Sequence, residues 1–348
     1  MKRYLYIIIF VVNIVLSGCE RRELTYPSPY PLCDVLVNVD WSDVYPTPTG
    51  MTVMFFPTDD TAPTTVQTNT IHSASPRLRK GTYHVVVFNQ IPSDFGTLEF
   101  RGMDHYSTME VCATATTSKW YKTKANNDKI IVREPELFAA DRYENFEVTD
   151  AMVETSMQNR ARSKSMPAVS LNLKPMPMIY TATVRVKIEG IQNVRSMRGS
   201  LGGMAQGAFI ATAERNSHGV THLLEEWTVT KDEGSATNGE AIVMITTFGQ
   251  PLNALLPTDS KLFLSFLLVD NQTIINKEFN VGDLMQKDEH EFTITIQIGM
   301  GTKPGEEPRP EDDSVELPNV KPEGGSDSGF DAEIDGWDEE ENVDIPME

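Results

Sequence analysis

The sequence predicts an all-β protein with two consecutive β-sandwich regions and an acidic C-terminal tail. Short apolar runs recur between clusters of proline, glycine, asparagine and threonine, a pattern typical of strands joined by turns. No segment of 12 residues or more shows the convincing apolar spacing of an amphipathic helix. Each region is about 120–135 residues long, which is enough chain to bury a core of its own.

The N-terminus reads as an export signal. Lys2 and Arg3 precede an apolar run, Tyr4 to Leu16, of about 13 residues, shorter than the ~20 that a membrane-spanning helix needs. The run ends in Leu16-Ser17-Gly18-Cys19, the small residues and cysteine typical of a bacterial lipoprotein cleavage site. We therefore expect a signal peptide over residues 1–18.

Cleavage at this point makes Cys19 the first residue of the mature chain and its predicted lipidation site. Acyl chains on its sulfur and amine would hold the protein to a membrane, since each buried CH₂ contributes roughly 0.8 kcal/mol. Residues 19–32 read as a tether, because Pro27, Pro29 and Pro31 alternate there and disfavour regular pairing.

The first β region is predicted over residues 33–155. Val35, Val37, Val39 and Trp41 alternate with other residues, which indicates a half-buried strand. The segment Leu78 to Asn89 contains a strand that is apolar on both faces, so we expect it in the middle of a packed sheet.

The second β region is predicted over residues 156–300. Thr183 to Glu189 and Phe292 to Ile298 alternate without a break, and Leu262 to Val269 is nearly continuous in apolar residues. Between the two regions, residues 154–166 are polar and read as an interdomain connection or an exposed loop.

The negative charge is concentrated at the C-terminus. The formal net charge is −20, and residues 301–348, with 17 acidic and three basic side chains, account for −14 of it. Six prolines and six glycines lie among the acids, so we expect this tail to be disordered. The remaining body carries only −6 and has no basic surface that would predict nucleic-acid binding.

With Cys19 lipidated, Cys33 and Cys112 remain. An exported compartment permits a disulfide between them, which is one interpretation. The other is that both are buried thiols that pack as small apolar side chains.

No motif for catalysis, a metal or a cofactor stands out. His218 and His222 are four residues apart, but the residues between them favour a loop leading into a strand at the surface over a metal site. The glycines at 199–207 lack the lysine and hydroxyl residue of a phosphate loop and read as turns. We therefore predict no catalytic residues, no metal and no cofactor.

Two tryptophan environments differ. Trp41 shares the apolar face of its strand, which predicts core packing. Trp120 and Tyr121 lie between polar runs and are the more plausible exposed aromatic pair, the type of side chains that stack on sugar rings.

Three stretches resemble the Bacteroides-type fimbrillin superfamily, most closely its fimbrium anchor or accessory lipoproteins. One is Leu78 to Phe88, similar to a Gly-x-Tyr strand of the first domain. Another is Val184 to Gly190, followed by the glycine-rich stretch Ser200–Ala213. The third runs from Phe279 through Phe292–Ile298. Together they span roughly residues 33–300, and their order carries most of the resemblance.

This resemblance implies two tandem transthyretin-like β-sandwiches and a role in fimbrial assembly or cell adhesion. Subunits of that type add a strand to a neighbour's sheet, after proteolysis that usually follows an arginine. Arg21 and Arg22 directly follow the lipid cysteine, so cleavage there would release the protein without opening a groove. An anchor or accessory subunit is therefore expected, with fimbrial subunits as partners.

The charged residues Glu20 to Glu23 also resemble a surface-export signal of Bacteroides-type lipoproteins, which implies display on the outer membrane. The alternative function is a surface glycan-binding lipoprotein of a polysaccharide-uptake system, with Trp120 and Tyr121 as contacts. An exported hydrolase has the least support, because no acid/base pair stands out.

Overall fold

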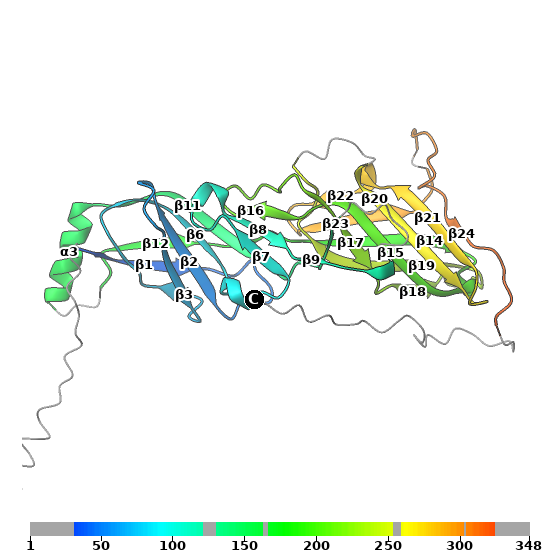
Figure 1. Cartoon of the computed structure of the whole chain (residues 1–348), viewed down its shortest axis with the longest axis horizontal. Helices are drawn as coiled ribbons and strands as arrows, with labels where there is room; N and C mark the ends of the chain where they lie inside the picture. Colours follow the sequence, from blue (N-terminus) through cyan, green and yellow to red (C-terminus); the bar gives the residue numbers. More distant parts are fainter. Residues whose placement is uncertain (1–30, 121–129, 163–165, 253–258, 303, 324–348) are drawn as a thin grey trace, which may run out of the picture.

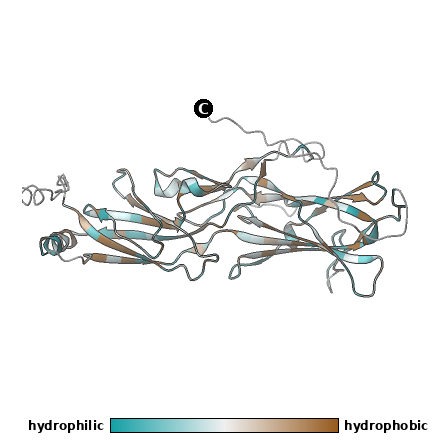
Figure 2. Cartoon of the chain, turned by 90° about the horizontal axis from the view of Figure 1, so that it is seen from below, coloured by the Kyte–Doolittle hydropathy of each residue, from teal (hydrophilic) through white to brown (hydrophobic). Residues whose placement is uncertain are grey.

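The structure is a computed structural model that describes residues 31–120, 130–162, 166–252, 259–302 and 304–323. The all-β prediction is confirmed, since strands in five sheets make up about half of the described chain, far more than helices do. The molecule is elongated, with strands of the N-terminal half at one end and strands of the C-terminal half at the other (Figure 1). A view turned by 90° shows the same elongated outline (Figure 2).

The first two sheets pack face to face and form a first sandwich. Sheet 1 has the order β12 (Val169–Leu173), β1 (Cys33–Val39) and β4 (Ser73–Ala74), and β5 (Arg77–Leu78) also pairs with β1. Sheet 2 has the order β13 (Met176–Pro177), β11 (Ala139–Val148), β6 (Gly81–Asn89), β2 (Met51–Pro57) and β3 (Thr64–Thr68). Between them lies one apolar cluster, to which β1 contributes its alternating residues as predicted.

The central strands of sheet 2, β2 and β6, are buried on their second face as well. Val86 and Phe88 of β6 point away from sheet 1 and pack against sheet 3. Sheet 3 has the order β16 (Gly207–Phe209), β8 (Glu110–Ala113) and β7 (Leu98–Arg101). Because β6 has an apolar layer on either side, its residues from 85 to 89 are all buried. The prediction of a strand in the middle of a packed sheet is confirmed.

Two further sheets form a second sandwich. Sheet 4 has the order β21 (Ile274–Asn280), β20 (Lys261–Leu268), β15 (Val194–Ala205), β17 (Gly219–Leu224), β10 (Ile131–Val132) and β9 (Ala115–Thr116). Sheet 5 has the order β18 (Thr228–Lys231), β19 (Asn238–Thr247), β14 (Tyr180–Glu189), β23 (Thr293–Ile298) and β22 (Gln286–Asp288), and β24 (Val315–Glu316) also pairs with β14.

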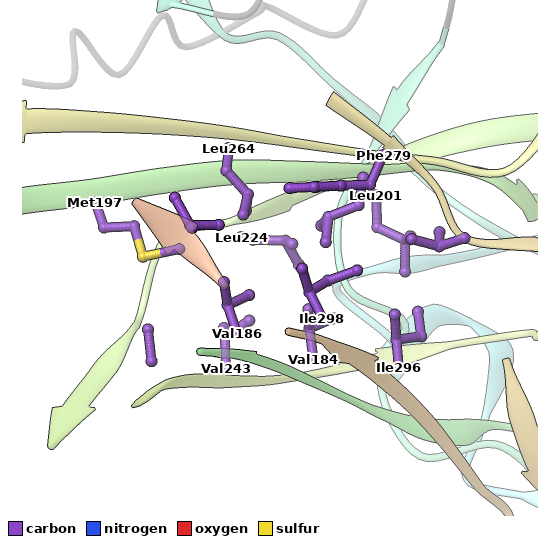
Figure 3. Close-up of a cluster of buried hydrophobic side chains, with 14 of the residues drawn as sticks. Val184, Val186, Met197, Leu201, Leu224, Val243, Leu264, Phe279, Ile296 and Ile298 are labelled. Atoms are coloured by element: carbon purple, nitrogen blue, oxygen red, sulfur yellow. The ribbon is translucent and has the colours of Figure 1, made fainter. Parts of the chain in front are cut away.

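The core of the second sandwich consists of aliphatic side chains from both sheets. Val184 and Val186 of β14 meet Leu201 of β15 and Leu264 of β20 across the interior (Figure 3). Ile296 and Ile298 of β23 complete the layer. The alternation seen in the sequence therefore faces this core, because every second residue of β14 and β23 points inward.

Short 3₁₀ turns join several strands, and one α-helix interrupts the β pattern. The turns are η1 (Pro92–Asp94), η2 (Tyr106–Thr108), η3 (Ile191–Asn193) and η5 (Gly282–Leu284). The helix, α3 (Asp150–Ala161), lies at the end of the first sandwich (Figure 1).

Helix α3 corrects our interpretation of residues 154–166 as a connection or exposed loop. Thr149 is its N-cap, and the Thr149 side chain accepts a hydrogen bond from the backbone N–H of Met152. Val153 and Ser156 are its buried residues. With a serine in one buried position, the helix lacks the apolar periodicity by which sequence analysis finds amphipathic helices.

The expectation of disorder from residue 301 is wrong for the part of the tail that the structure describes. Val315 and Leu317 are buried, and β24 runs parallel to β14 opposite Ile188 and Glu189. The backbone N–H of Leu317 donates to the carbonyl of Glu189 (2.9 Å). Burial of two aliphatic side chains fixes this segment despite the acids around it. Residues 324–348 lie outside the described residues.

His222 is a buried titratable side chain of sheet 4. It lies on β17 and is 1% exposed, and among the described residues neither ring nitrogen has a hydrogen-bond partner. Burial lowers its pKa to about 4. The folded protein therefore disfavours a proton that the unfolded chain binds below about pH 6.5.

We expect the free energy of unfolding to fall by about 3 kcal/mol between pH 6.5 and pH 4 on account of this group. Denaturant titrations at several pH values should show that His222→Leu removes this part of the acid sensitivity. His290→Gln, at an exposed histidine, is the control and should keep the wild-type profile. An unchanged slope in His222→Leu would contradict the assignment.

Candidate functional site: the tethered end and the sheet edges

The first described residues meet helix α3. The Arg160 guanidinium donates through Nη2 to the carbonyl of Leu32 (2.7 Å). The backbone N–H of Ala168 donates to the carbonyl of Asp34 (3.0 Å). The chain that leads back to Cys19 therefore leaves the first sandwich beside α3, at one end of the long axis (Figure 1). Cys19 itself lies outside the described residues.

Asp34 is the centre of a polar cluster at this tethered end. Its carboxylate accepts hydrogen bonds from Ser156 Oγ (2.7 Å), Arg160 Nε (2.7 Å) and Arg77 Nε (3.2 Å). Its backbone N–H donates to Ser156 Oγ (2.8 Å). Burial alone would raise the pKa of Asp34, but the hydrogen bonds and charges of these partners hold the pKa below its usual value. The cluster thus ties α3 to the start of β1.

This cluster was not predicted from the sequence, because no role was assigned to Asp34 and Arg160 read as part of a polar connection. The sequence signal that could have indicated helix α3 was Thr149, a residue type favoured at N-caps, followed by the acidic Asp150 in the first turn.

We expect Ser156→Ala to destabilise the protein by about 1–3 kcal/mol, because the Asp34 N–H at the edge of the core loses its acceptor. Urea denaturation measures this loss. Thr155→Ala, at the neighbouring exposed position of the same helix, should change stability by less than about 0.5 kcal/mol. Equal effects of the two substitutions would show that the cluster contributes nothing beyond helix propensity.

The two remaining cysteines do not form a disulfide. Cys33, opposite Leu78, lies in the core between sheets 1 and 2, whereas Cys112 lies on β8 opposite Gly207. Both are fully buried free thiols, as in the second interpretation of the sequence. Burial, and then the nearby Glu110 carboxylate, raise the pKa of Cys112 to about 12, so this thiol is protonated and unreactive.

The predicted aromatic pair is only partly described. Trp120 is half-buried, and its ring centroid lies 6.1 Å from that of Phe263 on β20. Tyr121 lies outside the described residues, so the pair remains a prediction. Trp41 is buried, with Nε1 donating to the carbonyl of Ile71 (2.8 Å), and its predicted place in the core is confirmed.

The two histidines of the predicted pair differ in their exposure to solvent. His218 is exposed, and His222 is buried within β17, so our expectation of a surface position is wrong for His222. Within the described ranges, no three His, Cys, Asp or Glu side chains lie together as metal ligands would.

A search of the helices in the described part of the chain finds none with the length and apolar character of a membrane span.

The edges of the sheets differ in charge. Charged residues mark four of them, namely Glu99 and Arg101 on β7, Lys231 on β18, Lys277 and Glu278 on β21, and Lys287 and Asp288 on β22. The longest uncharged edges are β12 and β3. The end of β12 is bound to the neighbouring sheet, because the backbone N–H of Lys174 donates to Asp141 Oδ2 on β11 (2.6 Å). Among these edges, β3 therefore has the fewest obstacles to pairing with another strand.

A family model described as "Domain of unknown function (DUF5119)" matches residues 18–225. A curated protein of Bacteroides ovatus, "Putative fimbrium anchoring subunit Fim4B", is 23% identical over 362 aligned residues, which cover 99% of this chain and 98% of the relative. This whole-length match confirms the resemblance to fimbrium anchor proteins that the sequence predicted.

Of two solved structures that match this chain, one is similar in fold. The crystal structure of a putative adhesin from Bacteroides ovatus superposes with a TM-score of 0.55 at 18% identity, and covers 87% of this chain and 98% of the adhesin. The fimbrial anchor protein Mfa2 from Porphyromonas gingivalis gives a TM-score of 0.44 at 11% identity, and covers 76% of this chain and 88% of that protein.

Proposed function

This chain belongs to the DUF5119 family, and we propose that it is a non-enzymatic anchor or accessory subunit of a fimbrium, held at the outer membrane by an acylated Cys19. The observation that carries the proposal is the alignment with a putative fimbrium anchoring subunit over 99% of the chain. Both sandwiches and the N-terminal segment fall within that alignment. The proposal therefore concerns the whole protein and not a shared module.

The position of α3 supports lipid attachment at one end of the molecule. Residues 20–30 separate Cys19 from the described chain, a length that reaches at most about 40 Å when extended and roughly 20 Å as a flexible coil. The α3 end would then stay close to the membrane. The second sandwich, at the opposite end of the long axis, would project away from the membrane (Figure 1).

We propose two tandem transthyretin-like domains, with the boundary after β12 instead of at residues 155/156. Leu171 and Leu173 of β12 pack in the core of the first sandwich, whereas Tyr180 opens β14 of the second. Strand addition by a partner subunit is most compatible with the uncharged edge β3.

Outer membranes should retain the wild-type protein together with fimbrial subunits, and Cys19→Ala should shift it to soluble fractions, since it removes the lipidated thiol. Quantitative co-purification from native membranes measures both. Cys112→Ala is the matched control, because Cys112 is a buried thiol away from the tether, and its membrane fraction should equal that of wild type.

Two results would overturn parts of the proposal. Membrane retention of Cys19→Ala would exclude the lipid anchor. Recovery of the wild-type protein with polysaccharide or glycan-uptake proteins alone would replace the fimbrial role by glycan binding, with Trp120 and Tyr121 as the first residues to substitute.

A further inference from the structure

We propose that the two sandwiches form a single cooperative unit, so that tension at one end passes to the other through shared sheets and not through a linker. The relevance of tension rests on the proposed anchoring role, whereas the coupling itself does not. The inference derives from the strands that each half of the chain supplies to the other half.

The N-terminal half supplies two strands to the second sandwich. β10 runs parallel to β17, with Ile131 opposite Thr221 and Val132 opposite His222, and β9 adds to the free side of β10. The backbone N–H of Thr221 also donates to the carbonyl of Ile130 (2.9 Å). At one end of sheet 4, the last two strands, β10 and β9, therefore come from the N-terminal half of the chain.

The C-terminal half in turn supplies one strand to a sheet of the N-terminal half. β16 pairs antiparallel with β8, from Gly207 opposite Cys112 to Phe209 opposite Glu110. The same connection is extended by the backbone N–H of Ala113, which donates to the carbonyl of Gln206 (2.8 Å), and by that of Ile210, which donates to Met109 (2.9 Å). The two halves are thus hydrogen-bonded to each other in both directions.

A common apolar core lies where these strands meet. Phe88 and Phe138 from the N-terminal half pack in one cluster with Val220 and Phe248 from the C-terminal half. Phe88, Phe138 and Phe248 are fully buried. Separating the halves would expose these aromatic rings to water, which is unfavourable because the burial of apolar surface stabilises the folded chain.

Arg215 holds the returning strand against the second sandwich. It follows β16 and donates through Nε to the carbonyl of Phe248 (3.0 Å). Its guanidinium carbon lies 4.9 Å from the ring centroid of Tyr180 at the start of β14, and Lys287 Nζ lies 4.7 Å from the same centroid. The Tyr180 hydroxyl donates to Glu289. Both ends of the β16 segment are therefore fixed, one to each half of the molecule.

The side chain of Glu134 adds a further connection. Glu134 Oε2 of the N-terminal half accepts from the backbone N–H of Thr246 (3.0 Å), and Thr246 Oγ1 donates to the carbonyl of Pro135 (2.7 Å). These bonds join the segment after β10 to β19 of sheet 5. Sheets 4 and 5 are therefore both bound to the N-terminal half.

Substitution of Gly207 selectively disrupts the pairing of β16 with β8. A Cβ at this position would lie 2.1 Å from the carbonyl oxygen of Val111 and 2.8 Å from Cys112 Sγ, so Gly207→Ala forces β16 away from β8. Gly219→Ala is the matched control, because the nearest atom to its Cβ, the Gly203 Cα, is 4.0 Å away.

Scanning calorimetry of the mature, non-acylated chain tests the coupling. We expect one unfolding transition for wild type and for Gly219→Ala, with equal calorimetric and van't Hoff enthalpies. Gly207→Ala should split it into two transitions, the lower one shifted below the wild-type Tm. Two separate transitions in the wild type would overturn the proposal, as would a single unshifted transition in Gly207→Ala.

If Gly207→Ala does not fold, mechanical unfolding of the wild-type chain, pulled by its two termini, tests the coupling instead. A single unfolding event that releases both sandwiches supports the coupling, and two separate events of sandwich size refute it. Neither experiment contains fimbrial subunits, so failure here is distinguishable from failure of the proposed function.

Discussion

The central strands of sheet 2, β2 and β6, have no solvent-facing side, and the remaining layers are arranged by the need to cover them. The backbone of β6 places Val85 and Val87 toward sheet 1 and Val86 and Phe88 toward sheet 3. An apolar layer is needed on each face, because exposing either would forfeit the burial of several large side chains. Sheet 1 covers one face with strands from both sides of α3. The other face is covered by short strands, one of which, β16, comes from the C-terminal half.

This constraint explains why the two sandwiches are more closely joined than two domains on a linker. The short strands β7 and β8 cannot cover sheet 2 alone, and residues such as Phe248 and Val220 complete the layer. In return, β9 and β10 extend sheet 4. For a protein proposed to connect a membrane lipid to a fimbrium, such an arrangement carries load across the middle of the molecule through hydrogen-bonded strands.

Strong local patterns could be predicted from the sequence. The alternation in β1, β14 and β23 and the two-faced burial of β6 each follow from side chains a few residues apart. The strands that each half of the chain supplies to the other half could not be predicted in this way. β10 has two residues and β16 has three, and what defines them is their partner strand far away in the sequence. The same holds for β24, whose pairing depends on the length of β14 that β23 leaves free.

The candidate site was predictable in part. Cys19 follows from a local motif, whereas the Asp34 cluster joins residues more than 120 positions apart and includes a helix whose buried face contains a serine. The disulfide interpretation relied on the compartment, and the structure instead places Cys33 in the core of the first sandwich and Cys112 on β8 of sheet 3, both as free thiols. Whole-length similarity then supplied what no single motif could, namely the relation to a fimbrium anchoring subunit.

Native-state hydrogen exchange tests the shared core most directly. The account predicts that the slowest amides of β6 in the first sandwich and of β20 in the second exchange through the same global opening, with equal free energies and equal dependence on denaturant. A lower opening free energy for either strand would show that one sandwich unfolds while the other stays intact, and would contradict the account.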